Sequence, residues 1–214
     1  MLLIGPPGAG KGTQAKLLQG HFHVPHVSSG DLLRASVLKH NTVGIEAESY
    51  MQRGELVPDS VLIRVVEERL AEADCAKGFI LDGFPRTIAQ AEVLEGLLTR
   101  LHTKLDNVTS IKVPGSELVR RISGRRQCPE CGSVYHVELD PPKKQEVCDT
   151  CGGSLRQRND DREATVVARL GVYERETAPL LDYYRKRGIL REVNGVGGRD
   201  QIAKEILALA GADA

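Results

Sequence analysis

A glycine-rich stretch near the N-terminus has the residue types and the spacing needed to bind phosphate. The stretch GPPGAGKGT, residues 5–13, follows an apolar run and precedes a helical pattern. Glycines let successive backbone N–H groups turn towards one anion, and a helix start adds the positive end of its dipole. Lys11 then places a cation beside the β- and γ-phosphates of a nucleotide. The residues expected to bind these phosphates are Gly8, Ala9, Gly10, Lys11, Gly12 and Thr13.

This stretch departs from the strict phosphate-loop pattern at the residue after the lysine. Gly12 stands where the pattern has Ser or Thr as a Mg²⁺ ligand, and the hydroxyl comes one residue later, at Thr13. The sequence therefore does not predict direct ligation of the metal by a hydroxyl. The alternative for the whole stretch is a glycine-rich turn with a solvated lysine, which fits so many fixed positions poorly.

Cysteines form a second group with the spacing of a metal site. Cys128 and Cys131 make one C-x-x-C pair, Cys148 and Cys151 make another, and a glycine follows each pair. Four thiolates at this spacing bind Zn²⁺ tetrahedrally, which leaves no position for water or substrate, so we expect a structural zinc. A pair of disulfides or a redox dithiol is the alternative, and neither suits a chain without a thioredoxin-like pattern. Cys75 stands alone and is expected to be a buried small hydrophobic residue.

Charge and length exclude several classes of protein. The 214 residues carry 29 Lys and Arg against 29 Asp and Glu, so no overall field attracts nucleic acid or a membrane surface. No run approaches the roughly 18 apolar residues of a membrane span, and the absence of a signal peptide points to the cytoplasm. The arginines are uneven, however, and indicate either a bound anion or a solvated face. They crowd the part of the chain after residue 119, at positions 120, 121, 125, 126, 156, 158, 162 and 169.

Short apolar runs alternate with helical patterns along the chain, which predicts a parallel, doubly wound sheet with helices on both faces. The apolar run at 78–82 ends in Asp82, as expected of a buried strand with an acid at its carboxyl end. Residues 127–157 break the alternation and form a small separate module. The strands are expected at 1–4, 24–27, 78–82, 108–113 and 189–193, and the helices at 12–20, from 28 onward, and at 41–53, 58–70, 87–101, 116–126, 160–184 and 199–210.

Together these motifs resemble the adenylate kinases, in the long form whose lid binds zinc. The resemblance covers essentially the whole chain and implies a five-stranded parallel-sheet nucleoside monophosphate kinase fold with a small zinc-ribbon-like lid. It implies a core of residues 1–27, 58–119 and 161–214, an AMP-binding helical segment at 28–57, and a lid at 120–160. The motifs are GPPGAGKGTQ, SGDLLR (29–34), DGFPRT (82–87) with Gln90, RxxGR (121–125), VYH (134–136), RxDD (158–161) with Arg169, and TAPL (177–180).

The resemblance also implies the reaction and its residues. The γ-phosphoryl of MgATP would pass to AMP, giving two ADP, in a cytoplasmic monomer that serves purine nucleotide salvage and energy homeostasis. The catalytic residues would be Lys11, Arg86, Arg121, Arg125, Arg158 and Arg169. ATP would contact the phosphate-loop residues with Arg121, Arg125, Val134, Tyr135 and Gly197. AMP would contact Ser29, Arg34, Glu55, Leu56, Val57, Gly83, Phe84, Arg86, Gln90, Arg158 and Arg169, and Asp82 would bind Mg²⁺ through water.

The chemistry of the residues agrees with this reaction. An AMP phosphate is already an oxyanion, so the transfer needs alignment and positive charge and no general base. Gln90 is the expected reader of the AMP base, since an amide both accepts and donates along the adenine edge. Two alternatives stay open: the same chemistry with UMP or CMP as acceptor or GTP as donor, and a zinc-ribbon nucleotide switch that binds nucleic acid or protein. Balanced charge and the lack of interleaved aromatic residues count against the switch.

Overall fold

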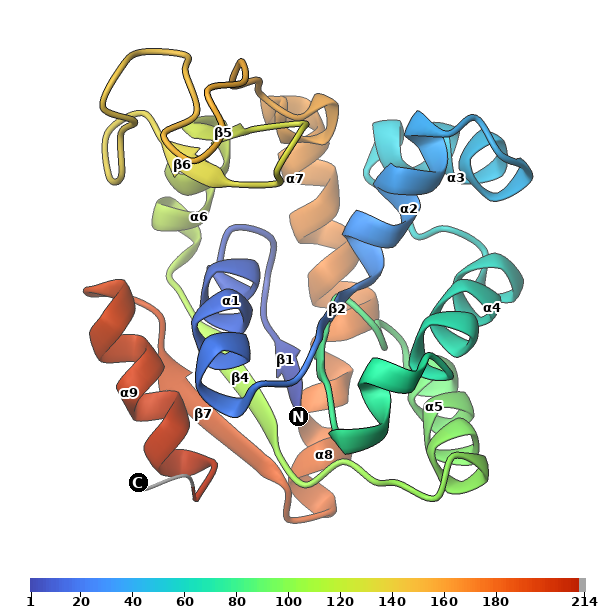
Figure 1. The fold of residues 1–214 in the computed structure, drawn as a ribbon. Coiled ribbons are helices and arrows are strands. Elements are labelled where there is room, and N and C mark those ends of the chain that lie inside the picture. The colour runs from blue at the N-terminus through green and yellow to red at the C-terminus, as the bar shows by residue number, and fades with distance from the viewer. Residues whose placement is uncertain (212–214) are drawn as a thin grey trace.

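Five short parallel strands form one sheet at the centre of the molecule (Figure 1). The structure is a computed structural model and describes residues 1–211. The strand order is β2-β3-β1-β4-β7, so the first strand lies in the middle of the sheet. This confirms the predicted five-stranded parallel sheet. The strands are β1 (Leu2–Ile4), β2 (His26–Ser28), β3 (Ile80–Asp82), β4 (Val108–Lys112) and β7 (Leu190–Asn194).

The central strands β1, β3 and β4 are buried on both faces, as is usual for the inner strands of a parallel sheet covered by helices. Successive side chains of a strand point to opposite faces, so Leu2 and Leu3 belong to two different cores. Leu2 packs in the core that includes Leu94 and Leu180, whereas Leu3 packs in the core that includes Leu18. The sheet is therefore held between two hydrophobic layers.

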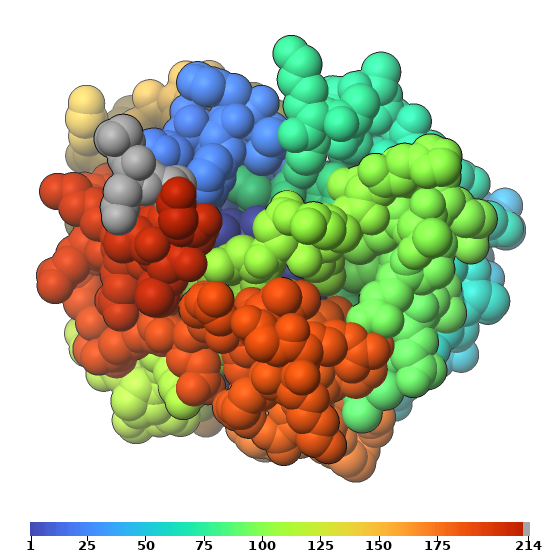
Figure 2. All heavy atoms as spheres, turned by 90° about the horizontal axis from the view of Figure 1, so that it is seen from below, coloured from blue at the N-terminus to red at the C-terminus, as the bar shows by residue number. Residues whose placement is uncertain are grey.

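Helices supply the outer side of each layer (Figure 1). One core contains residues of α1 (Lys11–Phe22), α6 (Gly115–Ser123) and α9 (Arg199–Leu209). The other contains residues of α4 (Asp59–Leu70), α5 (Ile88–Arg100) and α8 (Pro179–Lys186). Seen from below, the red and orange C-terminal segments lie beside the green segment of α5 and almost hide the dark-blue N-terminal strand (Figure 2). The sheet is thus covered at this end, and its opposite end is left for the site.

Two smaller parts rise above the carboxyl ends of the strands (Figure 1). One is a helical pair, α2 (Ser29–Leu38) and α3 (Thr42–Arg53). The other contains an antiparallel pair of strands, β5 (Arg125–Gln127) and β6 (Val134–His136). They stand on either side of α7 (Glu163–Val172), so a space between them opens onto the sheet.

Several predicted boundaries were wrong. The strand expected at 24–27 lies at His26–Ser28, and the helix expected at 116–126 ends at Ser123 because residues 125–127 pair with β6. The predicted helix at 160–184 is divided into a 3₁₀ turn η2 (Asn159–Asp161), α7, a π-helical turn η3 (Tyr173–Thr177) and α8. Pro179 has no N–H to continue the α-helical pattern, and the Ala178 N–H bonds to the Tyr173 carbonyl at 2.9 Å instead.

The remaining short element, η1 (Ala73–Lys77), is a 3₁₀ turn that carries Cys75. The Cys75 side chain is 5% exposed and belongs to one of the two main cores, which confirms the prediction of a buried thiol. No helix within residues 1–211 is both long and apolar enough to cross a membrane.

The crossing of α2 and α3 gives a test of packing. A Cβ at Gly44 would lie 2.1 Å from the Ser36 carbonyl oxygen, closer than atoms can approach. We expect Gly44→Ala to lower the free energy of unfolding by about 1–3 kcal/mol, or Tm by several degrees. Gly96→Ala, on an exposed face of α5, meets only the end of the Arg100 side chain and is the matched control. Thermal unfolding of both variants measures this difference in stability, and equal Tm values would contradict the close crossing of α2 and α3.

Candidate active site

One large cavity, about 1050 Å³ in volume, lies at the carboxyl ends of the strands. Its walls come from the loop after β1, from Asp82 at the end of β3, from Gly195 after β7, and from the two smaller parts above the sheet. Parallel α/β sheets bind ligands at this edge, where the strand order reverses next to the first strand. The fold therefore positions residues from distant parts of the sequence around one space.

The glycine-rich loop forms the floor of this cavity. Gly8 and Gly10 have φ values of 84° and 92°, a left-handed conformation that favours glycine. A Cβ at Gly8 would also lie 2.8 Å from the Ile122 side chain. Lys11 begins α1, and its Nζ donates to the carbonyl oxygens of Gly5, at 2.7 Å, and Pro6, at 3.0 Å. The loop thus holds this ammonium at the floor of the cavity.

Burial changes the acid–base properties of this ammonium. Loss of solvent lowers the pKa of Lys11 from 10.5 to about 8, although the Asp82 carboxylate acts in the opposite direction. The neighbouring cations Arg86 and Arg169 lower the pKa of Lys11 further. A bound phosphate would reverse this effect, because a nearby anion favours the charged form of lysine.

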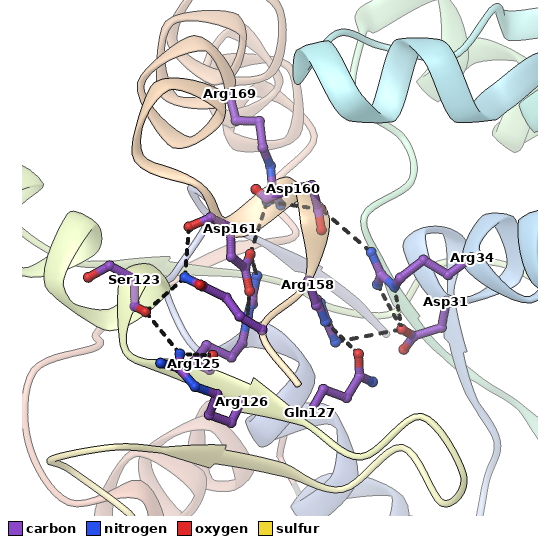
Figure 3. Close-up of polar contacts among 11 residues, drawn as sticks. Asp31, Arg34, Ser123, Arg125, Arg126, Gln127, Arg158, Asp160, Asp161 and Arg169 are labelled. Carbon is purple, nitrogen blue, oxygen red and sulfur yellow. Dashed lines mark hydrogen bonds and ion pairs between the residues drawn. The ribbon is translucent and has the colours of Figure 1, made fainter. Parts of the chain in front are cut away.

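Four arginines from separate elements, Arg34, Arg125, Arg158 and Arg169, converge in the cavity wall, and each lies near a carboxylate (Figure 3). Arg125 forms a bidentate pair with Asp161, and Arg169 lies 3.0 Å from Asp160. On the other side, Arg158 approaches Asp31 at 3.8 Å. Arg34 pairs with Asp31 at 2.7 Å and lies 3.7 Å from Asp160. The acids belong to α2 and to η2, so this network joins the helical pair to the segment before α7.

The cations outweigh these acids inside the cavity. Burial, together with the charge of Arg169, lowers the pKa of Arg86 to about 10. Burial also lowers the pKa of Arg158 to about 9, and the charges of Arg34 and Arg125 add to this effect. Both side chains stay protonated at neutral pH, because these values lie above it. Burial alone would raise the pKa of Asp160, but the surrounding arginines reverse this and lower it. The cavity is therefore built to receive an anion of high charge.

The part of the cavity near α2 and α3 has a different lining. Arg86 donates from Nε to the Gly83 carbonyl at 2.7 Å, and the Ser29 hydroxyl donates to the same oxygen at 2.7 Å. Leu56 and Val57 add apolar surface next to this polar group. This region can therefore hold a phosphate beside a flat apolar group such as a nucleobase.

The structure brings most of the predicted site residues to the cavity wall. The lining includes Gly8, Ala9, Gly10, Lys11, Gly12, Thr13, Arg34, Glu55, Leu56, Val57, Asp82, Gly83, Arg86, Arg121, Arg125, Val134, Tyr135, Arg158, Arg169 and Gly197. Ser29, Phe84 and Gln90 are not part of the lining and lie directly behind it, each 1% exposed or less. The Gln90 amide is bonded inside the protein, to the Arg86 N–H and to Asp59.

Contacts across the cavity mouth were not predicted from the sequence. Lys16, on α1, donates from Nζ to the Gly132 carbonyl at 2.9 Å, and Arg199, at the start of α9, lies 2.9 Å from Asp140. Both contacts tie the segment around β5 and β6 to the core. Arg121 donates to the Gly195 carbonyl at 2.9 Å and so links α6 to the loop after β7.

The predicted cysteine site is assembled in the structure. The four Sγ atoms of Cys128, Cys131, Cys148 and Cys151 all lie within 4.8 Å of one another. A tetrahedral ion with Zn–S bonds of about 2.3 Å needs sulfur atoms about 3.8 Å apart, so the cluster fits such an ion. The Tyr135 hydroxyl lies 3.5 Å from Cys148 Sγ and accepts a hydrogen bond from the Asp149 N–H at 2.9 Å. The four cysteines, beside β5 and β6, could therefore hold a metal ion.

Asp82 fits a role beside a hard cation. The residue ends β3, is 9% exposed and faces the phosphate loop. Burial would raise the pKa of Asp82, but the His26 ring, whose Nε2 lies 3.5 Å from the carboxylate, and the charge of Lys11 outweigh it and lower the pKa. The side chain therefore stays a carboxylate, the ligand type that Mg²⁺ prefers directly or through water.

Sequence reasoning missed the acids that pair with the arginines. Asp31, Asp160 and Asp161 lie inside recognised motifs, yet a carboxylate in an anion site gives no signal of its own. Their proximity to arginines of opposite charge in the same motifs was the only available indication. Asp160 and Asp161 are 9% exposed or less, which confines them to the network described above.

Comparisons with known proteins agree with this geometry. The family model described as adenylate kinase matches residues 3–189. A protein of Syntrophobacter fumaroxidans named adenylate kinase is 52% identical over 211 residues, 99% of both chains. A protein with the same name from Methanocella arvoryzae is 51% identical over 97% of this chain and 96% of its own. Another from Archaeoglobus fulgidus is 52% identical over 98% of this chain and 96% of its own. This chain therefore belongs to the adenylate kinase family, the phosphotransferases that move a phosphoryl group from ATP to AMP.

Proposed function

We propose that this protein reversibly transfers the γ-phosphoryl of MgATP to AMP and that the cations around the cavity bind and stabilise the transferring group. Lys11 and the arginines Arg86, Arg121, Arg125, Arg158 and Arg169 surround the transferring group. The observation that supports this most strongly is the convergence of buried guanidinium groups opposite the phosphate loop (Figure 3). Such a set of charges has no simpler explanation than a polyphosphate.

The chemistry needs only these groups. The AMP phosphate attacks as an oxyanion, so no residue has to remove a proton. Negative charge spreads over the oxygens of the transferred group, and fixed cations in a cavity of low dielectric stabilise it without reorganising. Paired acids such as Asp161 hold the guanidinium groups in place before the substrates arrive. Exclusion of water from the closed cavity directs the phosphoryl group to AMP.

Each substrate has its own side of the cavity in this proposal. ATP binds the phosphate loop, with its base near Val134, Tyr135 and Gly197. Asp82 would hold Mg²⁺ through water, and the ion would neutralise part of the charge of ATP. AMP binds the side formed by residues 28–57, with its phosphate on Arg34 and Arg86. Ser29, Glu55, Leu56, Val57, Gly83 and Phe84 complete that side, Gln90 reads the base, and Arg158 and Arg169 reach both substrates.

The smaller parts then act as covers for the two nucleotides. Residues 28–57 form the AMP-binding segment, residues 120–160 form the lid, and the rest is the core. We propose that the cysteines bind zinc and that this zinc supports the fold of the lid, since sulfur fills its whole coordination shell. The complete cavity within one chain supports a monomer, and we propose that it works in the cytoplasm.

Lys11 gives the most direct test of these roles. We expect Lys11→Ala to lower kcat by about 100-fold or more while nucleotide binding weakens far less, because its charge acts mainly on the transition state. Lys104→Ala removes a lysine that is 86% exposed and is the matched control. Steady-state kinetics and equilibrium binding of both variants are compared. Near-normal kcat in Lys11→Ala would remove this lysine from the mechanism.

The depressed pKa of Lys11 predicts a pH dependence of binding. The free protein loses the Lys11 proton above about pH 8, whereas bound phosphates favour the protonated form. ATP binding at about pH 9 should therefore take up a proton, and affinity should fall as pH rises from about 8 towards 10.5. Calorimetry in two buffers of different ionisation enthalpy measures this uptake. The same uptake in Lys11→Met would contradict the assignment to Lys11.

The metal site gives a third test. Cys148→Ser combined with Cys151→Ser should abolish stoichiometric zinc and lower Tm, and should leave substantial activity well below that temperature. Structural zinc contributes about 10–16 kcal/mol in isolated zinc-finger peptides, and the effect should be smaller here because both ends of the lid join the core. Cys75→Ser, outside the cluster, should keep the metal. A stable double variant without any activity would make the metal part of the chemistry.

A further inference from the structure

Gln90 lies behind the AMP side of the cavity with its amide fixed by two partners. It stands in the first turn of α5, and its side chain is fully buried. Oε1 accepts a hydrogen bond from the Arg86 backbone N–H at 2.7 Å. Nε2 donates to Oδ1 of Asp59, the first residue of α4, at 2.6 Å. Arg86, whose N–H binds this amide, lines the cavity, and so does Val57, which precedes Asp59 by two residues.

The chemistry of these partners determines which way the amide points. A backbone N–H only donates, so the atom facing Arg86 must be the amide oxygen. An ionised carboxylate only accepts, so the atom facing Asp59 must be the amide nitrogen. If the Gln90 amide turned over, an N–H would face an N–H and an oxygen would face a carboxylate. The two contacts together therefore permit a single orientation.

That orientation matters because a glutamine amide can pair with either of two opposite arrangements of hydrogen-bond donor and acceptor on a base. A primary amide has two N–H donors and two acceptor positions, so one of each stays free after the Asp59 and Arg86 bonds are made. Adenine offers an amino group at C6 and an acceptor at N1, which complement a free amide oxygen and a free N–H. Hypoxanthine and guanine carry a carbonyl at C6 and a hydrogen on N1, which would require the reversed amide.

We propose that Asp59 is a specificity-determining positioning residue that holds the Gln90 amide in the orientation that accepts amino bases and rejects oxo bases. This inference rests on the proposed role of Gln90 as reader of the AMP base. Asp59 reaches no substrate in this account and acts through Gln90. A purely structural tie between α4 and the loop at Arg86 would affect all acceptors alike, so selectivity separates the two explanations.

The test compares AMP with inosine monophosphate, which differs only at C6 and N1 of the base. In Asp59→Asn the side chain can present either an oxygen or an N–H to Gln90, so the reversed amide no longer faces a carboxylate and is opposed only by the Arg86 N–H. We expect the ratio of kcat/KM for inosine monophosphate to that for AMP to rise about 10-fold, through KM of the acceptor and with KM for ATP unchanged. Asp59→Glu keeps an acceptor and should restore the wild-type ratio.

The matched control is Asp106→Asn, which removes a carboxylate that is 76% exposed, next to Lys104. An unchanged ratio in Asp59→Asn, or an equal change in Asp106→Asn, would overturn the inference. Gln90→Leu tests the underlying proposal separately. If Gln90→Leu relaxes selectivity and Asp59→Asn does not, the role of Asp59 alone is wrong. If Gln90→Leu leaves selectivity intact, the base is read elsewhere and both proposals fail.

A spectroscopic measurement covers the case in which Asp59→Asn folds less well. Protein labelled with ¹⁵N-glutamine gives side-chain NH₂ signals, and the pair missing in Gln90→Leu belongs to Gln90. In the wild-type protein these protons should exchange slowly with solvent, because one is bonded to Asp59 inside the protein. Asp59→Asn should shift this signal and speed its exchange. Identical Gln90 signals in the two proteins would show that Asp59 does not hold the amide.

Discussion

Repulsion between buried cations is the constraint on which this structure depends. Two unit charges 4 Å apart interact with about 4 kcal/mol at the effective dielectric of a protein, so guanidinium groups cannot share a cavity without partners. Carboxylates supply these partners: Asp161 for Arg125, Asp160 for Arg169, and Asp31 for Arg34. Burial is the main cause that lowers the pKa values of Arg86 and Arg158, and neighbouring arginines lower them further. The cavity wall carries nine Lys and Arg side chains against seven Asp and Glu, an excess that a polyphosphate would neutralise.

This charge balance involves parts of the chain that are far apart in sequence. Asp31 belongs to α2, Asp160 to the turn before α7, and Arg125 to β5. Ion pairs across these elements join α2 to the segment before α7, whereas Lys16 and Arg199 tie the segment around β5 and β6 to the core. In the proposed reaction the same arginines would contact both the protein's own acids and an incoming phosphate.

Much of this arrangement could be predicted from the sequence, because it depends on local patterns. The phosphate loop, the strands and the cysteine pairs each carry their signal within a few residues. The π-helical turn before Pro179 could not be predicted, because one widened turn does not noticeably change the spacing of apolar residues along a helix. The interior position of Gln90 was missed for another reason: its partners Asp59 and Arg86 come together only in the folded chain. The same holds for the acids of the arginine network, whose role depends on which cations face them.

In the proposed reaction these cations direct the phosphoryl group of ATP to AMP and exclude water as its acceptor. Phosphorus NMR of a single reaction mixture measures this directly, with purified protein, Mg²⁺ and equal amounts of ATP and AMP. We predict that one ATP and one AMP disappear for every two ADP formed, with no inorganic phosphate above the level without protein. Loss of ATP with release of inorganic phosphate, while AMP stays constant, would contradict it.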